Sequence, residues 1–265
     1  MAIIDAVVNY RRWLKRRNCS AHTVRNYMNT LRHFVLWLAQ PIEAVDSRTV
    51  AEFIDRLIGK RLHPKTINCY LDSVRGFYNY LILEEQVNIS NPVRRGYLLR
   101  LARPLPRHLR DEEIPRLFAV INSKRDRAMF MLMLRCGLRV AEVAQLTLPA
   151  LDLPRSQLFV YQGKGNKGRV VYVSHDAKQA LTDYLQCRPA SRTSALFLVD
   201  KGRCKGRPIS VRGIQKRMEH YAQHSGLEVS CHQLRHNAEF RIMPSSVAKC
   251  SSELCCSKRV SLIST

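Results

Sequence analysis

Apolar residues recur every three or four positions through the first 95 residues, which is the spacing of one face of a helix. The pattern predicts four helices, at about residues 3–17, 21–38, 47–59 and 64–82. Ser20 and Ser47 stand where the N-caps of the second and third helices are expected. Pro64 stands at the first position of the fourth, where its missing N–H costs nothing. The first part of the chain therefore reads as a helical domain.

From about residue 112 the apolar pattern becomes more varied, because helical stretches alternate with short strand-like ones. A helix is expected at about 112–121, although Pro115 would delay its start or bend it. Residues 127–135 are apolar nearly all round, which predicts a buried helix, and Gly137 fits its C-terminal cap. Further helices are expected at about 138–146, 176–186 and 210–224.

Strands are expected at about 157–161 and 169–173, joined by a glycine-rich turn over residues 163–168 that suits a hairpin. Residues 195–199 also look strand-like. Helices outnumber strands in this pattern, so the predicted fold class is mainly α with a small antiparallel β-sheet (α+β).

The net charge of the chain says more about the class of molecule it binds than about its fold. Lys and Arg number 44 against 21 Asp and Glu, a net charge of +23, while 46% hydrophobic residues are enough for a sizeable core. Such basicity favours nucleic acid first and an anionic membrane second. The sequence has no apolar run of membrane-spanning length and no signal-peptide core, so we expect a cytoplasmic protein that binds DNA or RNA.

The positive charge is unevenly distributed. Residues 1–95 hold 15 basic and 8 acidic side chains, whereas residues 96–236 hold 25 and 11. Residues 96–110 form a basic, proline-containing connector whose Arg100, Arg103 and Arg107 could lie along a phosphate backbone. The second part of the chain is therefore expected to carry most of the nucleic-acid contacts.

The nine cysteines do not indicate a metal centre. No C-x-x-C pair is present, and Cys255 and Cys256 are adjacent, which suits neither zinc nor a structural disulfide. We expect reduced, mostly buried thiols and no metal.

Three basic positions stand out in order along the second part: Arg139, Lys164, and the pair His232 and Arg235. The last two are three residues apart, so on a helix they project from one face and can meet a single ligand. Each has an ordinary structural alternative: Arg139 could pair with Glu142, the Gly-Lys turn could be only a turn, and H-x-x-R could be a polar helix surface.

Taken together, three motifs resemble the tyrosine recombinase (phage integrase) family. They are Cys-Gly-Leu-Arg-Val-Ala-Glu at 136–142, Gly-Lys-Gly-Asn-Lys at 163–167 and His-x-Leu-Arg-His at 232–236. The resemblance covers nearly all of residues 1–236. It implies a four-helix SAM-like core-binding domain at 1–95, a linker at 96–110 and a catalytic domain at 111–236. It also implies double-stranded DNA and other recombinase protomers as partners, no cofactor, and a bacterial, nucleoid-associated location.

The resemblance also assigns roles to individual residues. Members of the family cut DNA without metal, through attack of a tyrosine oxygen on a backbone phosphate, so preorganised cations stabilise the transition state. Arg139 and Arg235 would clamp the phosphate oxygens, His232 would assist proton transfer and Lys164 would protonate the leaving 5′ oxygen. Glu142 and His236 would support these groups. DNA contacts are expected from Arg100, Arg103, Arg107, Lys167 and Arg169.

The sequence departs from the family after His236. Family members continue with a Leu-Gly-His turn and the nucleophilic tyrosine, roughly thirty residues beyond the second arginine. Residues 237–265 contain no tyrosine, histidine or glycine, and the last tyrosine of the chain is Tyr221. We expect a poorly ordered, aberrant tail that begins at 237, arising from a shift of reading frame near codon 236. Translating the other two frames of the gene tests this.

Three functions remain open on these grounds. The chain could be an active recombinase that uses a serine or cysteine of the tail, a non-catalytic DNA-binding protein, or an inactive relic of a mobile element. Covalent attachment to DNA, site-specific binding without cleavage, or neither would distinguish them.

Overall fold

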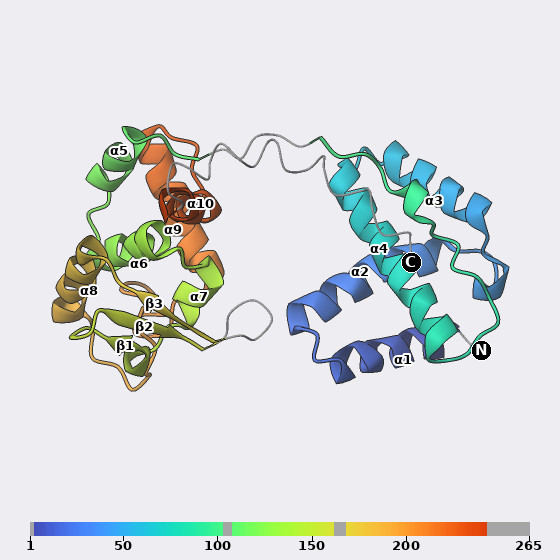
Figure 1. Ribbon diagram of the computed structural model, residues 1–265, viewed down its shortest axis with the longest axis horizontal. Coiled ribbons are helices and arrows are strands. Elements are labelled where there is room, and N and C mark those ends of the chain that lie inside the picture. Colours follow the sequence, from blue (N-terminus) through green and yellow to red (C-terminus); the bar gives the residue numbers. More distant parts are fainter. Residues whose placement is uncertain (1–2, 103–107, 162–167, 243–265) are drawn as a thin grey trace, which may run out of the picture. The chain divides into compact units, whose positions relative to one another are not determined.

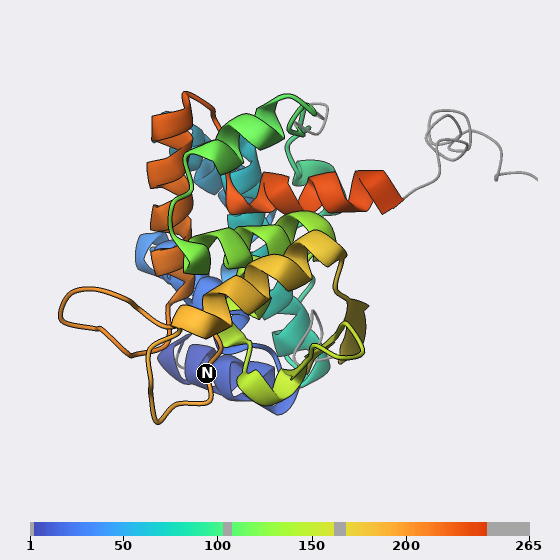
Figure 2. The same cartoon turned by 90° about the vertical axis from the view of Figure 1, so that its left-hand side faces the viewer.

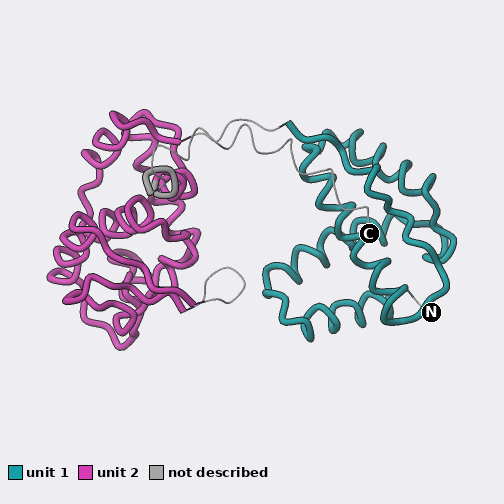
Figure 3. Tube along the Cα trace, viewed as in Figure 1, with its two compact units in different colours: residues 1–104 teal, residues 105–265 magenta. Residues whose placement is uncertain are grey.

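The computed structural model describes residues 3–102, 108–161 and 168–242, the last five of these by their backbone alone. The chain forms two compact units, residues 1–104 and 105–265 (Figure 3). Unit 1 is entirely helical, and unit 2 combines helices with a small sheet (Figure 1). The prediction of a mainly α fold with a small antiparallel sheet is therefore confirmed.

Unit 1 contains the four predicted helices. They are α1 (Ile3–Arg16), α2 (Ala21–Trp37), α3 (Ser47–Gly59) and α4 (Pro64–Leu83). Single 3₁₀ turns, η1 (Ile42–Ala44) and η2 (Arg95–Tyr97), follow α2 and α4. The core is rich in aromatic side chains: Phe34 and Phe53 meet edge to face at 5.1 Å, and the hydroxyl of buried Tyr78 donates to the carbonyl of Ile42 at 2.9 Å. These apolar faces pack as their spacing predicts.

One of the two predicted serine caps is wrong. Ser20 caps α2, because its hydroxyl accepts from the backbone N–H of Thr23 at 3.0 Å. At α3, however, the cap is Asp46, whose carboxylate accepts from the N–H of Thr49 at 2.9 Å, and Ser47 is already helical. Both residue types cap helices well, and the sequence offers them side by side, so only the backbone geometry selects one.

The chain continues to pack on unit 1 after α4. The amide side chain of Asn68 on α4 donates to the carbonyl of Leu99 and accepts from its N–H, both at 2.9 Å. Leu109, in contrast, belongs to the core of unit 2. The stretch between the two cores is therefore shorter than the connector expected at 96–110.

Unit 2 is arranged around α6 (Lys124–Cys136), which is buried along most of its length, as its apolar sequence predicts. Helices α8 (His175–Cys187) and α10 (Cys231–Ile242) pack against α6 (Figure 2). Around them lie α5 (Glu113–Ala119), α7 (Val140–Gln145) and α9 (Val211–Ser225). Pro115 lies in the first turn of α5, where its missing N–H leaves no helical hydrogen bond unmade.

The sheet has three antiparallel strands in chain order: β1 (Leu151–Asp152), β2 (Gln157–Val160) and β3 (Arg169–Tyr172), with a 3₁₀ turn, η3 (Leu148–Ala150), before β1. Leu158 pairs with Val171 and Val160 with Arg169. The expectation of a strand at 195–199 is wrong, because this segment makes only two isolated bridges, Thr147 with Ala195 and Leu198 with Pro208. Its apolar side chains enter the core without a partner strand long enough to form a ladder.

Six of the nine cysteines lie within the described residues, and fewer of these are buried than the sequence led us to expect. All six cysteines within the described residues are unbridged. Only Cys136 and Cys231 are buried, whereas Cys69, Cys187 and Cys204 are exposed. No cluster of three metal-binding side chains occurs in the described part of the chain. The same part contains no helix suited to crossing a membrane.

Candidate functional site

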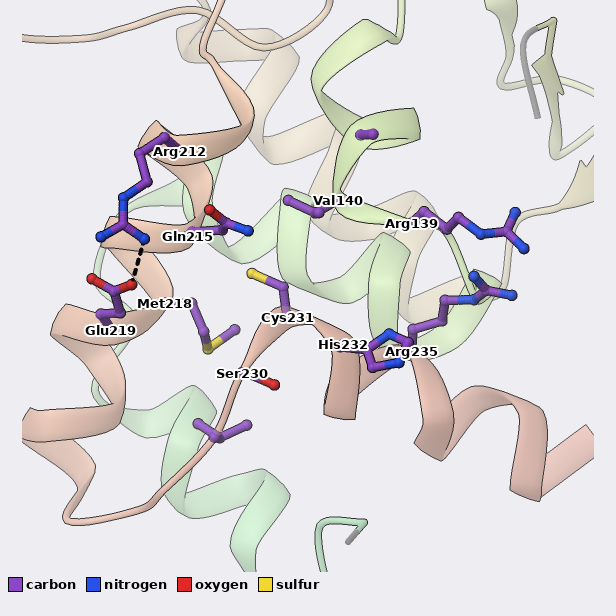
Figure 4. A pocket seen from close by; sticks show the side chains of 12 residues that line it. Arg139, Val140, Arg212, Gln215, Met218, Glu219, Ser230, Cys231, His232 and Arg235 are labelled. Atoms are coloured by element: carbon purple, nitrogen blue, oxygen red, sulfur yellow. Dashed lines mark hydrogen bonds and ion pairs between the residues drawn. The ribbon is translucent and has the colours of Figure 1, made fainter. Parts of the chain in front are cut away.

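A cavity of about 420 Å³ in unit 2 brings together Arg139, His232 and Arg235, three of the four predicted catalytic side chains. Helices α7, α9 and α10 form its walls. In Figure 4 the side chains of Arg139 and Arg235 extend toward the same end of the cavity, although 96 residues separate them in sequence. Two guanidinium groups on one side of a cavity offer the forked N–H donors that suit phosphate oxygens.

Arg139 owes its place to the turn that ends α6. Gly137 adopts φ 64°, a left-handed conformation that glycine reaches without strain, and its N–H bonds to the carbonyl of Leu132. Arg139 follows in extended conformation as the N-cap of α7. Arg139 thus stands in the turn between α6 and α7, and its side chain lines the cavity.

Glu142 holds Arg139 in this position. One carboxylate oxygen accepts from the backbone N–H of Arg139 at 2.8 Å and the other from its guanidinium at 2.9 Å. Arg169 on β3 donates to both oxygens at 2.8 Å. Burial alone would raise the pKa of Glu142, but the hydrogen bonds from Arg169 and Arg139 outweigh it and lower the pKa to about 2. Glu142 is therefore ionised at neutral pH and fixes two arginines.

The rotation of α10 sets the positions of His232 and Arg235. Leu234 is fully buried in the core, whereas the buried Cys231 lines the cavity together with His232 and Arg235. Burial raises the pKa of the Cys231 thiol to about 11, which keeps it protonated and inert. One turn further along, His236 lies beside His232, with their Nε2 atoms 3.0 Å apart. That hydrogen bond requires a proton on one of the two nitrogens.

The fold continues beyond His236. Helix α10 runs to Ile242, and the buried side chain of Asn237 accepts from the N–H of Leu109 at 3.0 Å and donates to its carbonyl at 2.8 Å. This pair of bonds fastens the start of unit 2 to α10. Position 237, at which the aberrant tail was expected to begin, is thus part of the packed structure, and residues 243–265 lie outside the described residues.

The opposite end of the cavity is lined by α9. Arg212 donates to Glu219 at 2.9 Å across two helical turns, so this end carries a neutralised pair (Figure 4). Val140, Met218 and Val229 supply an apolar wall. The positive charge is therefore concentrated at the end with Arg139 and Arg235, where an anion can bind.

Tyr221, the last tyrosine of the chain, does not face this cavity. It is 4% exposed, and its hydroxyl donates to Asp126 at 2.9 Å while accepting from Arg217 at 2.6 Å. Burial and the neighbouring Asp126 raise the pKa of Tyr221. No tyrosine of the described residues lines the cavity.

The other predicted site residues have different outcomes. Lys164, Lys167, Arg103 and Arg107 lie outside the described residues. Arg100 is exposed at the end of unit 1. Arg169 directs its guanidinium at Glu142, and its contact with DNA stays a prediction.

Sequence reasoning missed the contribution of α9 to the cavity. Arg212, Gln215 and Glu219 occur at helical spacing on a helix whose extent was predicted, but no motif distinguished them from a solvated face. The spacing of seven between Arg212 and Glu219 was a signal that they share a face.

Comparison with known proteins agrees with the motifs. Residues 107–248 match the phage integrase family, and residues 7–85 match the phage integrase N-terminal SAM-like domain. The chain is similar to the tyrosine recombinase XerC of Shewanella sp. (strain ANA-3), with 31% identity over 240 residues, covering 87% of this chain and 78% of the relative. It is also 27% identical over 245 residues to the tyrosine recombinase XerA of Thermococcus kodakarensis, covering 92% of this chain and 83% of that one.

The fold is shared with a solved structure of a lambda integrase dimer bound to a COC′ core site. The TM-score is 0.74 at 15% identity, covering all of this chain (100%) and 99% of that one. At such low identity the likeness concerns the fold alone. The family match extends to residue 248, which is twelve residues beyond His236.

Proposed function

The chain belongs to the phage integrase family, and we propose that it is a DNA-binding tyrosine recombinase homologue that holds a backbone phosphate but cannot cleave DNA. Arg139 and Arg235 bind the non-bridging oxygens, and His232 donates a hydrogen bond beside them. Glu142, whose pKa is lowered to about 2, holds Arg139 in place through its carboxylate. One observation carries the proposal: the phosphate-binding cations share a cavity, and no tyrosine of the described residues lines it.

The chemistry of the missing step supports the absence of cleavage. Covalent strand breakage needs an oxygen nucleophile within reach of the groups that activate it. The hydroxyl of Tyr221 is committed to Asp126 and Arg217 in the core. Residues 222–265 contain no tyrosine at all. The two arginines would then stabilise a bound phosphate without a group to attack it.

Double-stranded DNA is the proposed partner on two grounds. The net charge of +23 favours a polyanion. The lambda integrase dimer that shares this fold is bound to a core site, which also supports other protomers as partners. An active enzyme with a serine or cysteine nucleophile, and an inactive relic, are the competing functions that an experiment must separate.

Binding and cleavage are measured on the same DNA. We expect the unmodified chain to bind duplex DNA with an affinity that falls steeply with salt, by about 0.9 in log–log slope for each phosphate neutralised. We expect no covalent adduct after denaturation on nicked suicide substrates. The double variant R139A/R235A should lower the slope by about 2. R155A, which removes a cation that is 79% exposed and 3.9 Å from Asp152, is the control for charge alone and should change the slope by 1 at most.

Each alternative has its own result. A denaturation-resistant adduct mapped to any residue of the chain contradicts the proposal and identifies the nucleophile. If DNA affinity does not change with salt, or if the R139A/R235A variant binds DNA as the unmodified chain does, the proposed phosphate site is contradicted. A chain that neither binds nor cleaves DNA is the relic.

A further inference from the structure

We propose a second DNA contact outside the cavity, made by residues 199–208, which we call the cationic hairpin. Four of its residues are basic and would neutralise phosphates of the DNA backbone: Lys201, Arg203, Lys205 and Arg207. The inference rests on the proposed function of the chain as a DNA-binding protein. It adds an interaction surface that none of the recombinase motifs contains.

The backbone of the cationic hairpin is held in one conformation by hydrogen bonds and turns. Its base is closed by backbone hydrogen bonds from Val199 N–H to Arg207 carbonyl and from Gly206 N–H to Val199 carbonyl, both at 2.8 Å. Two tight turns close its tip, with N–H to carbonyl bonds from Lys205 to Gly202 and from Arg207 to Cys204, both at 3.0 Å. Gly202 and Gly206 adopt φ 78° and 79°, values that other residues reach only with strain.

One buried residue anchors the cationic hairpin to the core. A single guanidinium nitrogen of Arg125, at the start of α6, donates to the carbonyl of Leu198 at 3.0 Å and to Asp200 at 2.9 Å. Arg125 is itself 6% exposed and paired with Asp126. This anchor neutralises Asp200, the one acidic residue of the hairpin. The four cations beyond it are therefore presented on a base that is fixed to unit 2.

All four basic side chains are exposed, and none forms an ion pair with any residue that the structure describes. Several arginines elsewhere in unit 2 do form ion pairs: Arg135 pairs with Asp176, Arg169 with Glu142 and Arg217 with Asp126. Four like charges within seven residues repel one another unless anions neutralise them. The arrangement thus calls for an external polyanion.

The position of the hairpin indicates which polyanion. It leads through the Ser210 cap directly into α9, whose Arg212 lines the end of the cavity opposite Arg139 and Arg235. A duplex that places one phosphate in the cavity has neighbouring phosphates along the same backbone, at a spacing that lysine and arginine side chains on an adjacent loop can follow. An acidic protein surface would offer no such continuity with the cavity, so DNA is the favoured occupant.

The first test removes the charge and preserves the loop. In the variant with all four cations changed to Ala, we expect the log–log salt slope of duplex binding to fall by about 2 or more, at about 0.9 per lost phosphate contact. The matched control exchanges Lys for Arg and Arg for Lys at the same four positions, which retains the charge and should retain the slope. An unchanged slope in the alanine variant, or equal losses in both variants, overturns the inference.

The second test uses a native probe at the tip of the hairpin. Cys204 lies between the four cations and is exposed, as is Cys187 at the end of α8. Duplex DNA should slow iodoacetamide alkylation of Cys204 severalfold, with a smaller effect on Cys187, as read peptide by peptide in the unmodified full chain. Equal rates at Cys204 with and without DNA contradict the inference.

The two tests separate this inference from the proposed function. Salt-dependent DNA binding with an unchanged slope in the alanine variant retains the function and rejects the hairpin. Protection of Cys204 by an acidic protein but not by DNA assigns the hairpin to a protein partner instead. Absence of any DNA binding by the unmodified chain overturns both.

Discussion

Two carboxylates of unit 2, Glu142 and Asp126, are each buried and each hold two arginines, yet they serve different ends. Glu142 is bonded to Arg139 and Arg169 at 2.8–2.9 Å. Asp126 is bonded to Arg125 and Arg217 at 2.6–2.8 Å. Both carboxylates form ion pairs with two arginines, so the difference lies in what surrounds the guanidinium groups.

Both arginines that pair with Asp126 also donate hydrogen bonds to other groups of the protein. Arg125 continues to Leu198 and Asp200, and Arg217 also donates to the hydroxyl of Tyr221, over whose ring it lies at 4.8 Å. Around Glu142, the side chain of Arg139 is 35% exposed and lines a cavity that Arg235 also lines. A buried carboxylate thus stabilises the fold where its arginines bond to further protein groups, and prepares a binding site where one of its arginines lines a cavity.

The comparison predicts the largest loss of stability at Asp126. Changing Asp126 to Asn leaves the buried charge of Arg125 and the partly exposed charge of Arg217 without their carboxylate, which should lower the free energy of unfolding by about 3–5 kcal/mol. Chemical denaturation of the variant measures it. The matched control is Glu52→Gln, which removes a carboxylate from an exposed pair with Arg48 and should cost less than about 1 kcal/mol. Equal losses of unfolding free energy in the two variants would contradict the structural role of Asp126.

A somewhat smaller, pH-dependent effect is expected at Glu142. Its pKa in the folded chain is about 2, below its ordinary value of 4.5, so its contribution is present above pH 4.5 and lost as the pH falls through 2. Glu142→Gln should therefore be less stable than the unmodified chain by roughly 3 kcal/mol at neutral pH, at about 1.4 kcal/mol per pKa unit.

Denaturant titrations at several pH values measure this difference, which should shrink below about pH 4.5 and disappear near pH 2. Glu52→Gln is again the control and should show no comparable change with pH. A difference that stays constant from neutral to acid would mean that Glu142 contributes through its shape rather than its charge.

The smallest effect is expected at Tyr221. Changing it to Phe removes a hydroxyl that bonds Asp126 and Arg217 but keeps the ring, so the loss should be about 1–2 kcal/mol, with DNA affinity unchanged. Tyr161→Phe, at a tyrosine that is 64% exposed, should change the stability by less than about 0.5 kcal/mol. A Tyr221→Phe variant that loses a cleavage activity present in the unmodified chain would show that Tyr221 is a nucleophile after all.

The helices of both units were predictable because their apolar spacing and end signals agree, as at Ser20, Pro64 and Gly137. The sequence could not predict which of two adjacent capping residues, Asp46 or Ser47, begins α3. The strand predicted at 195–199 was wrong because a buried apolar segment has the same sequence pattern with or without a partner strand.

The sequence by itself determined the family, the mainly helical fold, and the order of Arg139, His232 and Arg235, because motifs and periodicity are local properties of a chain. Only the tertiary structure decided that these three line one cavity and that Tyr221 is committed to Asp126. It also decided that Asn237 is packed against Leu109, at the position where the aberrant tail was expected to begin. Such pairings join residues about a hundred positions apart, and their geometry depends on how α6 orients the helices packed around it.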